Sequence, residues 1–364
     1  MRKEKSVLKK VRNQELALNY LPILSKNYKI LFMERQDHLD IPLIDIYLND
    51  TCNLHCSFCV TKKGTSNLPI NASRYLKQLR PSVMSITGGG EPSIYRYEEK
   101  KIEDFIHTID EKIPLGIMTN GVELINESVF PRIEWLRVSI NAATQNSYLE
   151  LHNRDFFDRV LKNIITYLNS PIKKVAMGYV FTPASFKEMC LLSKVVIDRI
   201  FPHVLDKKDQ EKLTLQFRPV VDNDYHRFEL TQKDQQALRE EIDKLSSAEK
   251  EFLILQSNIM EALDNGCYDL SSSFDRCFVS LLQMNIDAQG NAYPCPQKAH
   301  LFEDSYGNIF EKDFFKTLPS RLKNCFEKKN CHTCPCCAQA RINALFEKKD
   351  LESNHCSKIK KVFF

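Results

Sequence analysis

The stretch TCNLHCSFCV, residues 51–60, places three cysteines within eight residues, directly after the apolar run IPLIDIYLN of residues 41–49. That run is rich in isoleucine and predicts a short strand. In a chain without the other signs of a small disulfide-rich protein, closely spaced thiols favour a metal or cluster site. Structural metal sites usually close with four protein ligands, so a set of three indicates a site with one open coordination position.

Five further apolar runs follow the first, and segments of helical period separate them. The six predicted strands are residues 41–49, 82–87, 114–119, 135–140, 174–181 and 213–221. The clearest helical segment is 184–200, whose apolar residues fall on one face. Alternating strands and helices form βα units, and right-handed crossovers make their sheet parallel. Six units are fewer than the eight of a closed barrel, so we expect an α/β fold with a partial, open (β/α)6 barrel.

The residue pattern of the sequence changes twice after the last predicted strand. Residues 230–264 are charged and of helical period, and LLQMNIDAQGNAYPCP, residues 281–296, predicts a β-hairpin that turns at DAQGN. The predicted division is an N-terminal extension 1–40, a partial barrel 41–225, a helical connector 226–276, a small cysteine-rich domain 277–345 and a C-terminal tail 346–364.

Composition argues against several classes of protein. Lys and Arg number 51 against 47 Asp and Glu, a net charge of +4 that is too balanced to indicate binding to nucleic acid or membrane. No apolar window is long enough to span a bilayer, and the basic start MRKEKSVLKKVR lacks the apolar core of a signal peptide. We therefore expect a cytoplasmic protein whose thirteen cysteines are reduced and available for metal binding or catalysis.

The spacing of Cys52, Cys56 and Cys59 is Cys-x3-Cys-x2-Cys, with Phe58 directly before the last cysteine. This pattern after a first strand resembles the signature of the radical S-adenosylmethionine enzymes, whose fold is a partial (β/α)6 barrel. The resemblance implies a [4Fe–4S] cluster on the three thiolates, with S-adenosylmethionine on the open iron and Phe58 near its adenine. Reductive cleavage would then give a 5′-deoxyadenosyl radical that abstracts hydrogen from a substrate. The residues alone leave open a zinc ion with a distant fourth ligand such as His55.

Further motifs of that family end the later predicted strands. SITGGGEPSIY (85–95) matches the Gly-Gly-Glu that receives the cofactor's ammonium group, MTNG (118–121) ends the third strand, and LRVSINAA (136–143) supplies two residues that face the ribose. The cofactor-binding residues that the resemblance implies are Phe58, Gly89, Gly90, Glu91, Ser139, Asn141 and Arg218. Taken alone, these positions equally suit a strand-to-helix turn, a helix cap and, for Arg218, a structural ion pair.

A second group of cysteines lies near the C-terminus. Cys277 is followed by twelve residues, Gly290, four residues and Cys295, a pattern that resembles the auxiliary-cluster domains called SPASM and twitch. The implied ligands of one auxiliary [4Fe–4S] cluster are Cys277, Cys295, Cys331 and Cys334. Closure at Cys337 in place of Cys334, and a zinc ribbon, stay open. So does a second cluster on Cys325, Cys336, Cys337 and Cys356.

The resemblance implies a radical S-adenosylmethionine oxidoreductase that oxidises or rearranges a small molecule, with the auxiliary cluster as electron acceptor. A flavodoxin or ferredoxin would supply electrons. About 40 residues precede the first strand, too few for a full peptide-recognition domain, which favours a small substrate over a short peptide. The catalytic residue is unassigned, and Asp222, Asp224 and Cys267 are weak candidates. The alternative from another class is a non-catalytic zinc-binding scaffold.

Overall fold

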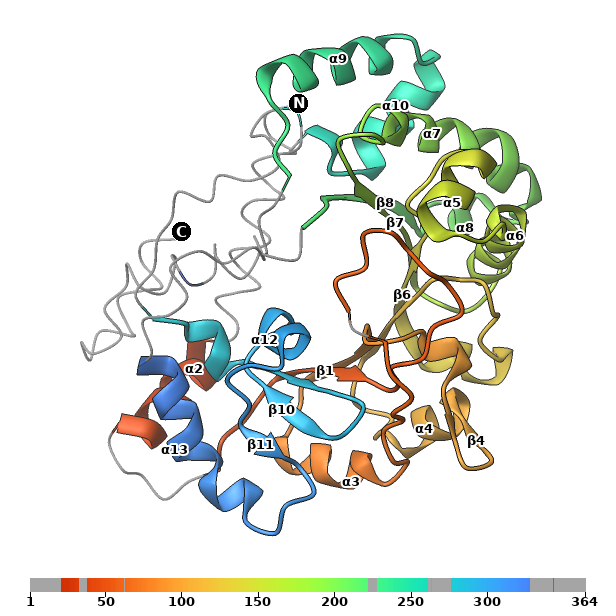
Figure 1. Cartoon of the computed structure of the whole chain (residues 1–364). Helices are drawn as coiled ribbons and strands as arrows, with labels where there is room; N and C mark the ends of the chain where they lie inside the picture. Colours follow the sequence, from red (N-terminus) through yellow and green to blue (C-terminus); the bar gives the residue numbers. More distant parts are fainter. Residues whose placement is uncertain are drawn as a thin grey trace.

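A single mixed sheet organises the molecule (Figure 1). The computed structural model describes residues 21–32, 38–61, 63–221, 228–260, 263, 276–327 and 343. In this part of the chain the order of the strands is β11-β10-β9-β1-β2-β5-β6-β7-β8. These strands are β1 Leu43–Tyr47, β2 Val83–Thr87, β5 Leu115–Thr119, β6 Ile133–Ser139, β7 Lys174–Phe181, β8 Leu213–Pro219, β9 Gln283–Ile286, β10 Asn291–Tyr293 and β11 Gly307–Asn308. A separate antiparallel pair consists of β3 Arg96–Tyr97 and β4 Lys100–Lys101.

The six strands expected from the apolar runs are confirmed, and they pair in parallel in the order of the chain. Their side chains alternate between two faces. On β8, Leu213, Leu215 and Phe217 are buried, whereas Thr214 and Arg218 are exposed. The apolar set joins the core under the helices, and the other set lines what we call the inner face of the sheet. The α/β class and the mostly parallel sheet therefore agree with the expected partial barrel.

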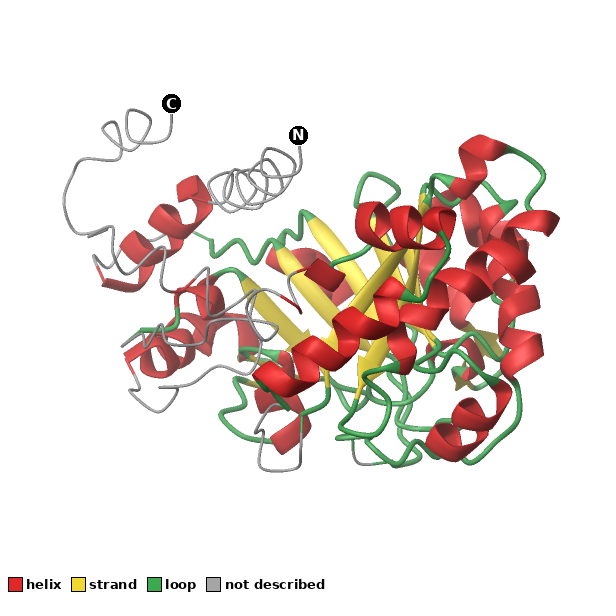
Figure 2. Cartoon of the chain, turned by 90° about the horizontal axis from the view of Figure 1, so that it is seen from above, coloured by secondary structure: helices red, strands yellow, loops and turns green. Residues whose placement is uncertain are grey.

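Helices connect the parallel strands and cover the outer face (Figure 2). They are α3 Ala72–Leu76, α4 Ile102–Thr108, α5 Gln145–His152, α6 Phe157–Leu168, α7 Leu192–Val195 and α8 Lys207–Gln210. In α6, Val160, Leu161 and Ile164 recur at helical spacing and are buried. The segment predicted as one helix over 184–200 is helical from Glu188, but it combines a 3-10 turn, α7 and a π turn. The buried and the exposed residues of this segment still lie on different sides of it.

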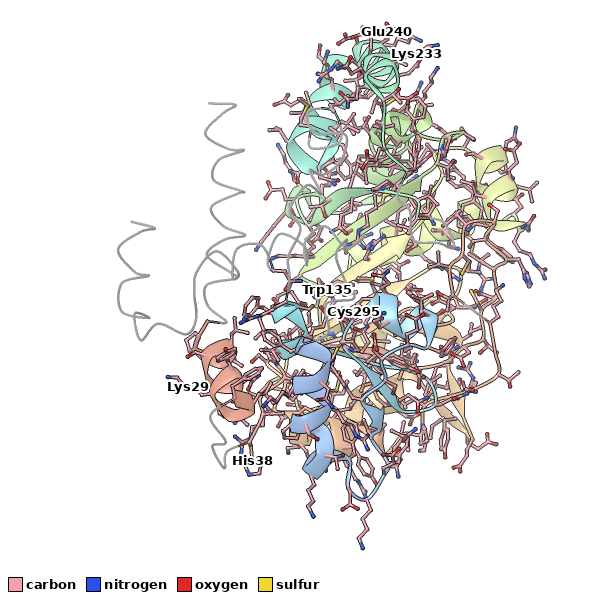
Figure 3. All side chains as sticks on the ribbon, turned by 60° about the vertical axis from the view of Figure 1, so that its left-hand side comes forward. Lys29, His38, Trp135, Lys233, Glu240 and Cys295 are labelled. Atoms are coloured by element: carbon pink, nitrogen blue, oxygen red, sulfur yellow. The ribbon has the colours of Figure 1, made fainter. Side chains whose placement is uncertain are left out.

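Two helices follow β8 where the charged periodic segment predicts them, α9 Gln232–Asp243 and α10 Ser247–Gln256. Each begins with a reciprocal capping box, in which Thr231 or Ser246 caps the helix and the acidic residue three positions later bonds back. Lys233 and Glu240 on α9 mark one end of the molecule (Figure 3). No helix in the described ranges is both long and apolar enough to cross a bilayer.

The predicted hairpin is confirmed, because β9 and β10 pair in antiparallel fashion about residues 287–290. Asp287 accepts hydrogen bonds from the backbone of Gln289 and Asn291, and Gly290 has a φ of +86°, which suits glycine. The sequence did not indicate that β9 also pairs in parallel with β1. The hairpin therefore extends the sheet of the parallel strands. The domain boundaries stay a prediction.

Two helices from opposite ends of the described chain, α2 Leu21–Phe32 and α13 Phe314–Glu327, pack together beside this hairpin (Figure 1). A third helix, α12 Pro296–Leu301, contacts β9 and β10. The rings of Tyr28 and Phe32 lie 6.1 and 5.5 Å from that of Phe326, and Asn27 Nδ2 donates to the carbonyl of Leu281 at 2.8 Å. Part of the segment expected to be an N-terminal extension is thus packed against the C-terminal region.

Candidate functional site

The three predicted cluster ligands lie on one loop between β1 and β2, which we call the cysteine loop (residues 51–60). Cys52 and Cys56 are half-buried, and Cys59 is exposed. Burial, reinforced by the nearby charges of Cys59 and Cys52, raises the pKa of Cys56 to about 12. Burial likewise raises the pKa of Cys52. The thiols of Cys52 and Cys56 are thus protonated when no metal is bound, so metal binding there must release protons.

Hydrogen bonds fasten the cysteine loop to the C-terminal end of α5. The backbone N–H of Ser57 donates to the carbonyl of Leu151 at 3.0 Å, and that of His55 donates to the carbonyl of His152 at 3.2 Å. Asn153 has a left-handed φ of +55° after the helix, and its Nδ2 donates to the carbonyl of His55 at 2.7 Å. The end of a helix thereby fixes the position of the middle of the loop.

His152 is a site residue that the sequence did not reveal. Its Nδ1 lies 3.0 Å from Cys56 Sγ, and its Nε2 lies 3.0 Å from the carbonyl of Ile140. A carbonyl oxygen only accepts, so Nε2 carries a hydrogen. The side chain is 1% exposed, and this burial lowers its pKa. The ring of Phe58 lies edge-on to it at 6.1 Å. A lone histidine at a helix end carries no sequence signal of such a contact.

Glu91 of the predicted Gly-Gly-Glu motif is 3% exposed, and burial raises its pKa. Its Oε1 accepts hydrogen bonds from Thr119 Oγ1 at 2.5 Å and from the N–H of Ser93 at 3.0 Å. Its Oε2 accepts from the N–H of Asn120 at 2.6 Å. The carboxylate therefore joins the end of β2 to the end of β5. A role for this residue toward a cofactor stays a prediction.

The glycines of the same motif permit close contact with the chain that leads into the cysteine loop. Gly89 has a φ of +96°, and a Cβ on Gly90 would overlap the carbonyl of Thr51. Gly90 donates its N–H to the carbonyl of Asn49 at 2.6 Å, and Glu91 donates to that of Thr51 at 2.7 Å. The close backbone approach expected of these glycines exists, and its partner here is the protein's own backbone.

Asn120, in the MTNG stretch after β5, approaches the first cysteine. Its Nδ2 donates to Asn53 Oδ1 at 2.7 Å and lies 3.9 Å from Cys52 Sγ, while its Oδ1 accepts from the N–H of Val122 at 3.0 Å. The amide is thus locked with its N–H groups toward the sulfur. Such hydrogen bonds stabilise negative charge on a ligating thiolate and tune the metal group that it holds.

The remaining predicted cofactor residues lie at the ends of β6 and β8. Ser139 is half-buried on the inner face, and Arg218 is exposed on the same face. Asn141 is buried with a left-handed φ of +55°, and its Oδ1 accepts a hydrogen bond from the N–H of Val180 at 2.9 Å. That acceptor is therefore occupied by the neighbouring strand. The ribose role of Ser139 and Asn141, and a cofactor-binding role of Arg218, stay predictions.

The three described cysteines of the second group lie near one tyrosine, Tyr306. Cys277, Cys295 and Cys325 all lie within electrostatic range of the fully buried hydroxyl of Tyr306, whose pKa is raised by burial and then by Cys325. Asn343 Nδ2 lies 3.5 Å from Cys277 Sγ. The structure thus adds Cys325 to the pair predicted as cluster ligands. The other predicted candidates, Cys331, Cys334, Asp222, Asp224 and Cys267, lie outside the described residues.

Residues 46–190 match the Radical SAM superfamily. GTP 3′,8-cyclase of Corynebacterium glutamicum is 26% identical over 161 residues, which cover 38% of this chain and 41% of that protein. An uncharacterized protein of Methanocaldococcus jannaschii is 26% identical over 142 residues, covering 38% and 44%. The chain thus spans less than half the length of these relatives.

Two solved structures share the fold. Streptococcus suis SuiB bound to the precursor peptide SuiA superimposes with a TM-score of 0.58 at 18% identity, over 87% of this chain and 74% of that one. The tagged protein anSMEcpe with bound AdoMet gives 0.50 at 15% identity, over 85% and 98%. The superfamily match begins within β1, extends past β7 and includes all three thiols of the cysteine loop, so residues 46–190 are similar to a radical SAM domain.

Proposed function

We propose that this protein cleaves S-adenosylmethionine reductively at a [4Fe–4S] cluster held by Cys52, Cys56 and Cys59. The observation that carries the proposal is the cysteine loop itself, which places three thiols on one short loop after the first strand of a parallel sheet, with Cys52 and Cys59 near enough to affect the pKa of Cys56. When bound, the cluster and S-adenosylmethionine supply a 5′-deoxyadenosyl radical that abstracts hydrogen from the substrate. Members of the radical SAM superfamily are enzymes that use these cofactors.

The donor set fits such a cluster. Three thiolates ligate three irons and leave the fourth iron open, whereas a structural zinc ion takes four ligands at one point. The Cys-x3-Cys-x2-Cys spacing of the thiols after the first strand favours a cluster over the zinc scaffold. The amide Nδ2 of Asn120 lies beside Cys52 Sγ, which supports a charged thiolate there. Nδ1 of His152, beside Cys56 Sγ, carries no hydrogen when Nε2 does, so it can accept the hydrogen of the Cys56 thiol.

The second cysteine group would hold an auxiliary cluster that accepts one electron from the substrate radical. Cys277 and Cys295 are its described ligands, and the position of Cys325 makes it a third candidate. Fully thiolate-ligated iron–sulfur clusters transfer electrons. Loss of a hydrogen atom and then of an electron oxidises the substrate by two electrons, which makes the enzyme an oxidoreductase. An electron donor such as flavodoxin or ferredoxin would reduce the first cluster.

We favour a small-molecule substrate, because the inner face of the sheet carries charged and amide side chains. Asp45 lies there with Gln283 and Asn285, whose amide nitrogens are 3.0 and 3.4 Å from its Oδ2. Polar groups that converge in this way suit the hydroxyl or amino groups of a small metabolite. A short peptide is the second candidate, because SuiB, which shares the fold, is solved with a precursor peptide.

Anaerobic reconstitution of the full chain followed by reduction with dithionite tests the proposal. We expect iron and sulfide in equal amounts, a reducible cluster by electron paramagnetic resonance, and 5′-deoxyadenosine by mass spectrometry. A colourless protein that retains zinc and no iron would overturn the proposal in favour of the scaffold. Deuterium transfer into 5′-deoxyadenosine from labelled metabolites or labelled peptides would then separate the two substrate classes.

A further inference from the structure

The inner face of the sheet carries a buried arginine that cluster binding does not use. Arg137, on β6 two residues before Ser139, is 6% exposed. Its Nη1 lies 3.8 Å from Met118 Sδ, a weak contact, and its Nε has no hydrogen-bond partner. No acidic side chain of the described residues lies within ion-pair distance of it. A buried charge without a partner is costly, so its presence calls for a ligand.

Two glycines on neighbouring strands give the large side chains of β6 their positions. A Cβ on Gly178 of β7 would collide with the guanidinium of Arg137, so the glycine lets this group lie flat across β7. A Cβ on Gly116 of β5 would collide with the indole of Trp135 in the same way. Trp135 and Arg137 therefore lie next to each other on the inner face, and Trp135 is seen near the middle of the molecule (Figure 3).

A second arginine adds to the positive charge of this region. Arg218 of β8 faces the same side of the sheet, across from Val180 of β7. Burial, and then repulsion from Arg218, lower the pKa of Arg137 to about 9, so Arg137 stays charged at neutral pH. Two guanidinium groups that repel each other and that lack a carboxylate among the described residues form a site for an anion.

We propose that Arg137 and Arg218 bind an anionic group of the substrate, a carboxylate or a phosphate, inside the open barrel. The proposal rests on the proposed function in one respect, namely that the ligand is the substrate of the radical reaction. Asp45, on β1 in the other half of the inner face, would meet a hydroxyl or amino group. The structure thus favours a small polar metabolite that carries an acidic group at one end and hydrogen-bonding groups at the other.

Trp135 offers a direct readout, because it is the only tryptophan of the chain. We would titrate the full-length apoprotein with inorganic phosphate, and separately with acetate, while recording its fluorescence at constant ionic strength set with KCl. We expect a saturable change in intensity or emission maximum with at least one of the two anions, and none with chloride. The anion that binds more tightly identifies the acidic group that the site prefers.

Substitutions locate the site. Arg137→Met keeps the length of the side chain and removes the charge, and we expect affinity for phosphate or acetate to fall at least tenfold. Gly178→Ala keeps the charge but displaces the guanidinium, and it should weaken binding as well. The matched control is Arg199→Gln, on the outer surface and paired with Asp158, which should bind the anions as the parent protein does. Unchanged affinity in Arg137→Met would overturn the proposal.

Thermal unfolding tests whether the variants are correctly folded. Removing a buried charge that has no partner should leave Tm unchanged or raise it in Arg137→Met. A fall of several degrees would show a structural partner for Arg137 and would count against the anion site. If Arg137→Met does not fold, Gly178→Ala and Arg137→Lys decide the question, because both retain the buried charge.

The carboxylate of S-adenosylmethionine is the competing source of an anion. Equilibrium dialysis of the reconstituted protein should give the same affinity for S-adenosylmethionine in Arg137→Met as in the parent. A tenfold loss would assign the arginine to the cofactor and would overturn the substrate assignment. Phosphate binding needs no cluster, so anion binding without 5′-deoxyadenosine formation would count against the proposed function alone. The reverse result would count against the anion site alone.

Discussion

The two cysteine groups are built in different ways. The first takes three thiols from one loop of ten residues, and the ends of several parallel strands support that loop. The second draws Cys277, Cys295 and Cys325 from the start of a 3-10 turn, the start of α12 and the last turn of α13. These segments meet only because tertiary packing brings them around Tyr306. The first group is therefore a local feature of the chain, and the second is a product of the whole fold.

Their surroundings differ as well. The cysteine loop has an exposed thiol, Cys59, and neighbouring hydrogen-bond donors, which suits a group that must still bind another molecule. The second group surrounds a fully buried tyrosine hydroxyl. A closed environment suits a group that exchanges only electrons. Under the proposed function, the first group does the chemistry and the second transfers electrons, and four experiments test this division of roles.

The largest effect should follow removal of the first group. Replacing Cys52, Cys56 and Cys59 by Ala should abolish formation of 5′-deoxyadenosine and lower the iron content by about four atoms per chain. Iron bound by the second group should persist, and iron analysis with electron paramagnetic resonance would measure both. Cys190→Ala is the matched control, because that thiol is buried in the core away from the loop, and it should keep all the iron. Residual cleavage in the triple variant would contradict the assignment.

Removal of the second group should separate cleavage from product formation. In Cys277→Ala or Cys295→Ala, we expect 5′-deoxyadenosine without substrate to stay within a few-fold of the parent, while oxidised product is lost. Chromatography of both compounds from one reaction would measure the ratio. Cys325→Ala tests whether the thiol beside Tyr306 belongs to the same set. Product that survives loss of Cys277 or Cys295 would rule out the electron-acceptor role.

A smaller effect is expected from the histidine beside the cysteine loop. His152→Phe keeps a ring in the buried space but removes both nitrogens next to Cys56 and Ile140. Residues that orient metal ligands typically contribute 10- to 100-fold to metal affinity, so the variant should lose iron to a chelator about 10 to 100 times faster. His107→Gln, an exposed histidine on α4, should release iron at the parental rate. If His152→Phe loses iron at the same rate as the parent protein, His152 has only a packing role.

The smallest effect concerns the contact between the two regions. His300 of α12 stacks on Tyr47 of β1 at 5.5 Å, and burial lowers its pKa to about 4. The folded state resists protonation that the unfolded chain accepts from about pH 6.5 downward, so this histidine costs stability as the pH falls from 6.5 toward 4. His300→Phe should reduce that acid loss by about 1–3 kcal/mol at pH 4.5. Urea unfolding of both proteins at pH 7.5 and 4.5 measures the difference, and an equal loss would argue against a neutral buried ring.

The sequence predicted what depends on local pattern. Apolar runs predicted the six parallel strands, and the Cys-x3-Cys-x2-Cys spacing placed Cys52, Cys56 and Cys59 on one loop after the first strand. The cofactor roles of these cysteines and of Gly89 and Gly90 stay predictions. Each of these features depends on residues that are neighbours in the chain, so its physical cause is visible in a short window.

The features that the sequence missed depend on distant residues. The pairing of β9 with β1 joins segments far apart in the chain. His152 contacts Cys56 only because the end of α5, which follows β6, lies beside the cysteine loop. Arg137 stood in the quoted stretch LRVSINAA, but its position depends on Gly178 of another strand. Such relations need the three-dimensional arrangement, because neither partner carries a local signal of the other.

The ladder between β1 and β9, from Leu43 opposite Gln283 to Ile46 opposite Ile286, has a consequence for electron movement. One strand leads into the cysteine loop, and the other leads into the hairpin that ends at Cys295. Electron tunnelling slows exponentially with distance, and a hydrogen-bonded ladder does not stretch. Under the proposed electron transfer, the ladder would therefore hold the two segments that carry the thiol groups at a nearly constant distance, whatever moves elsewhere in the chain.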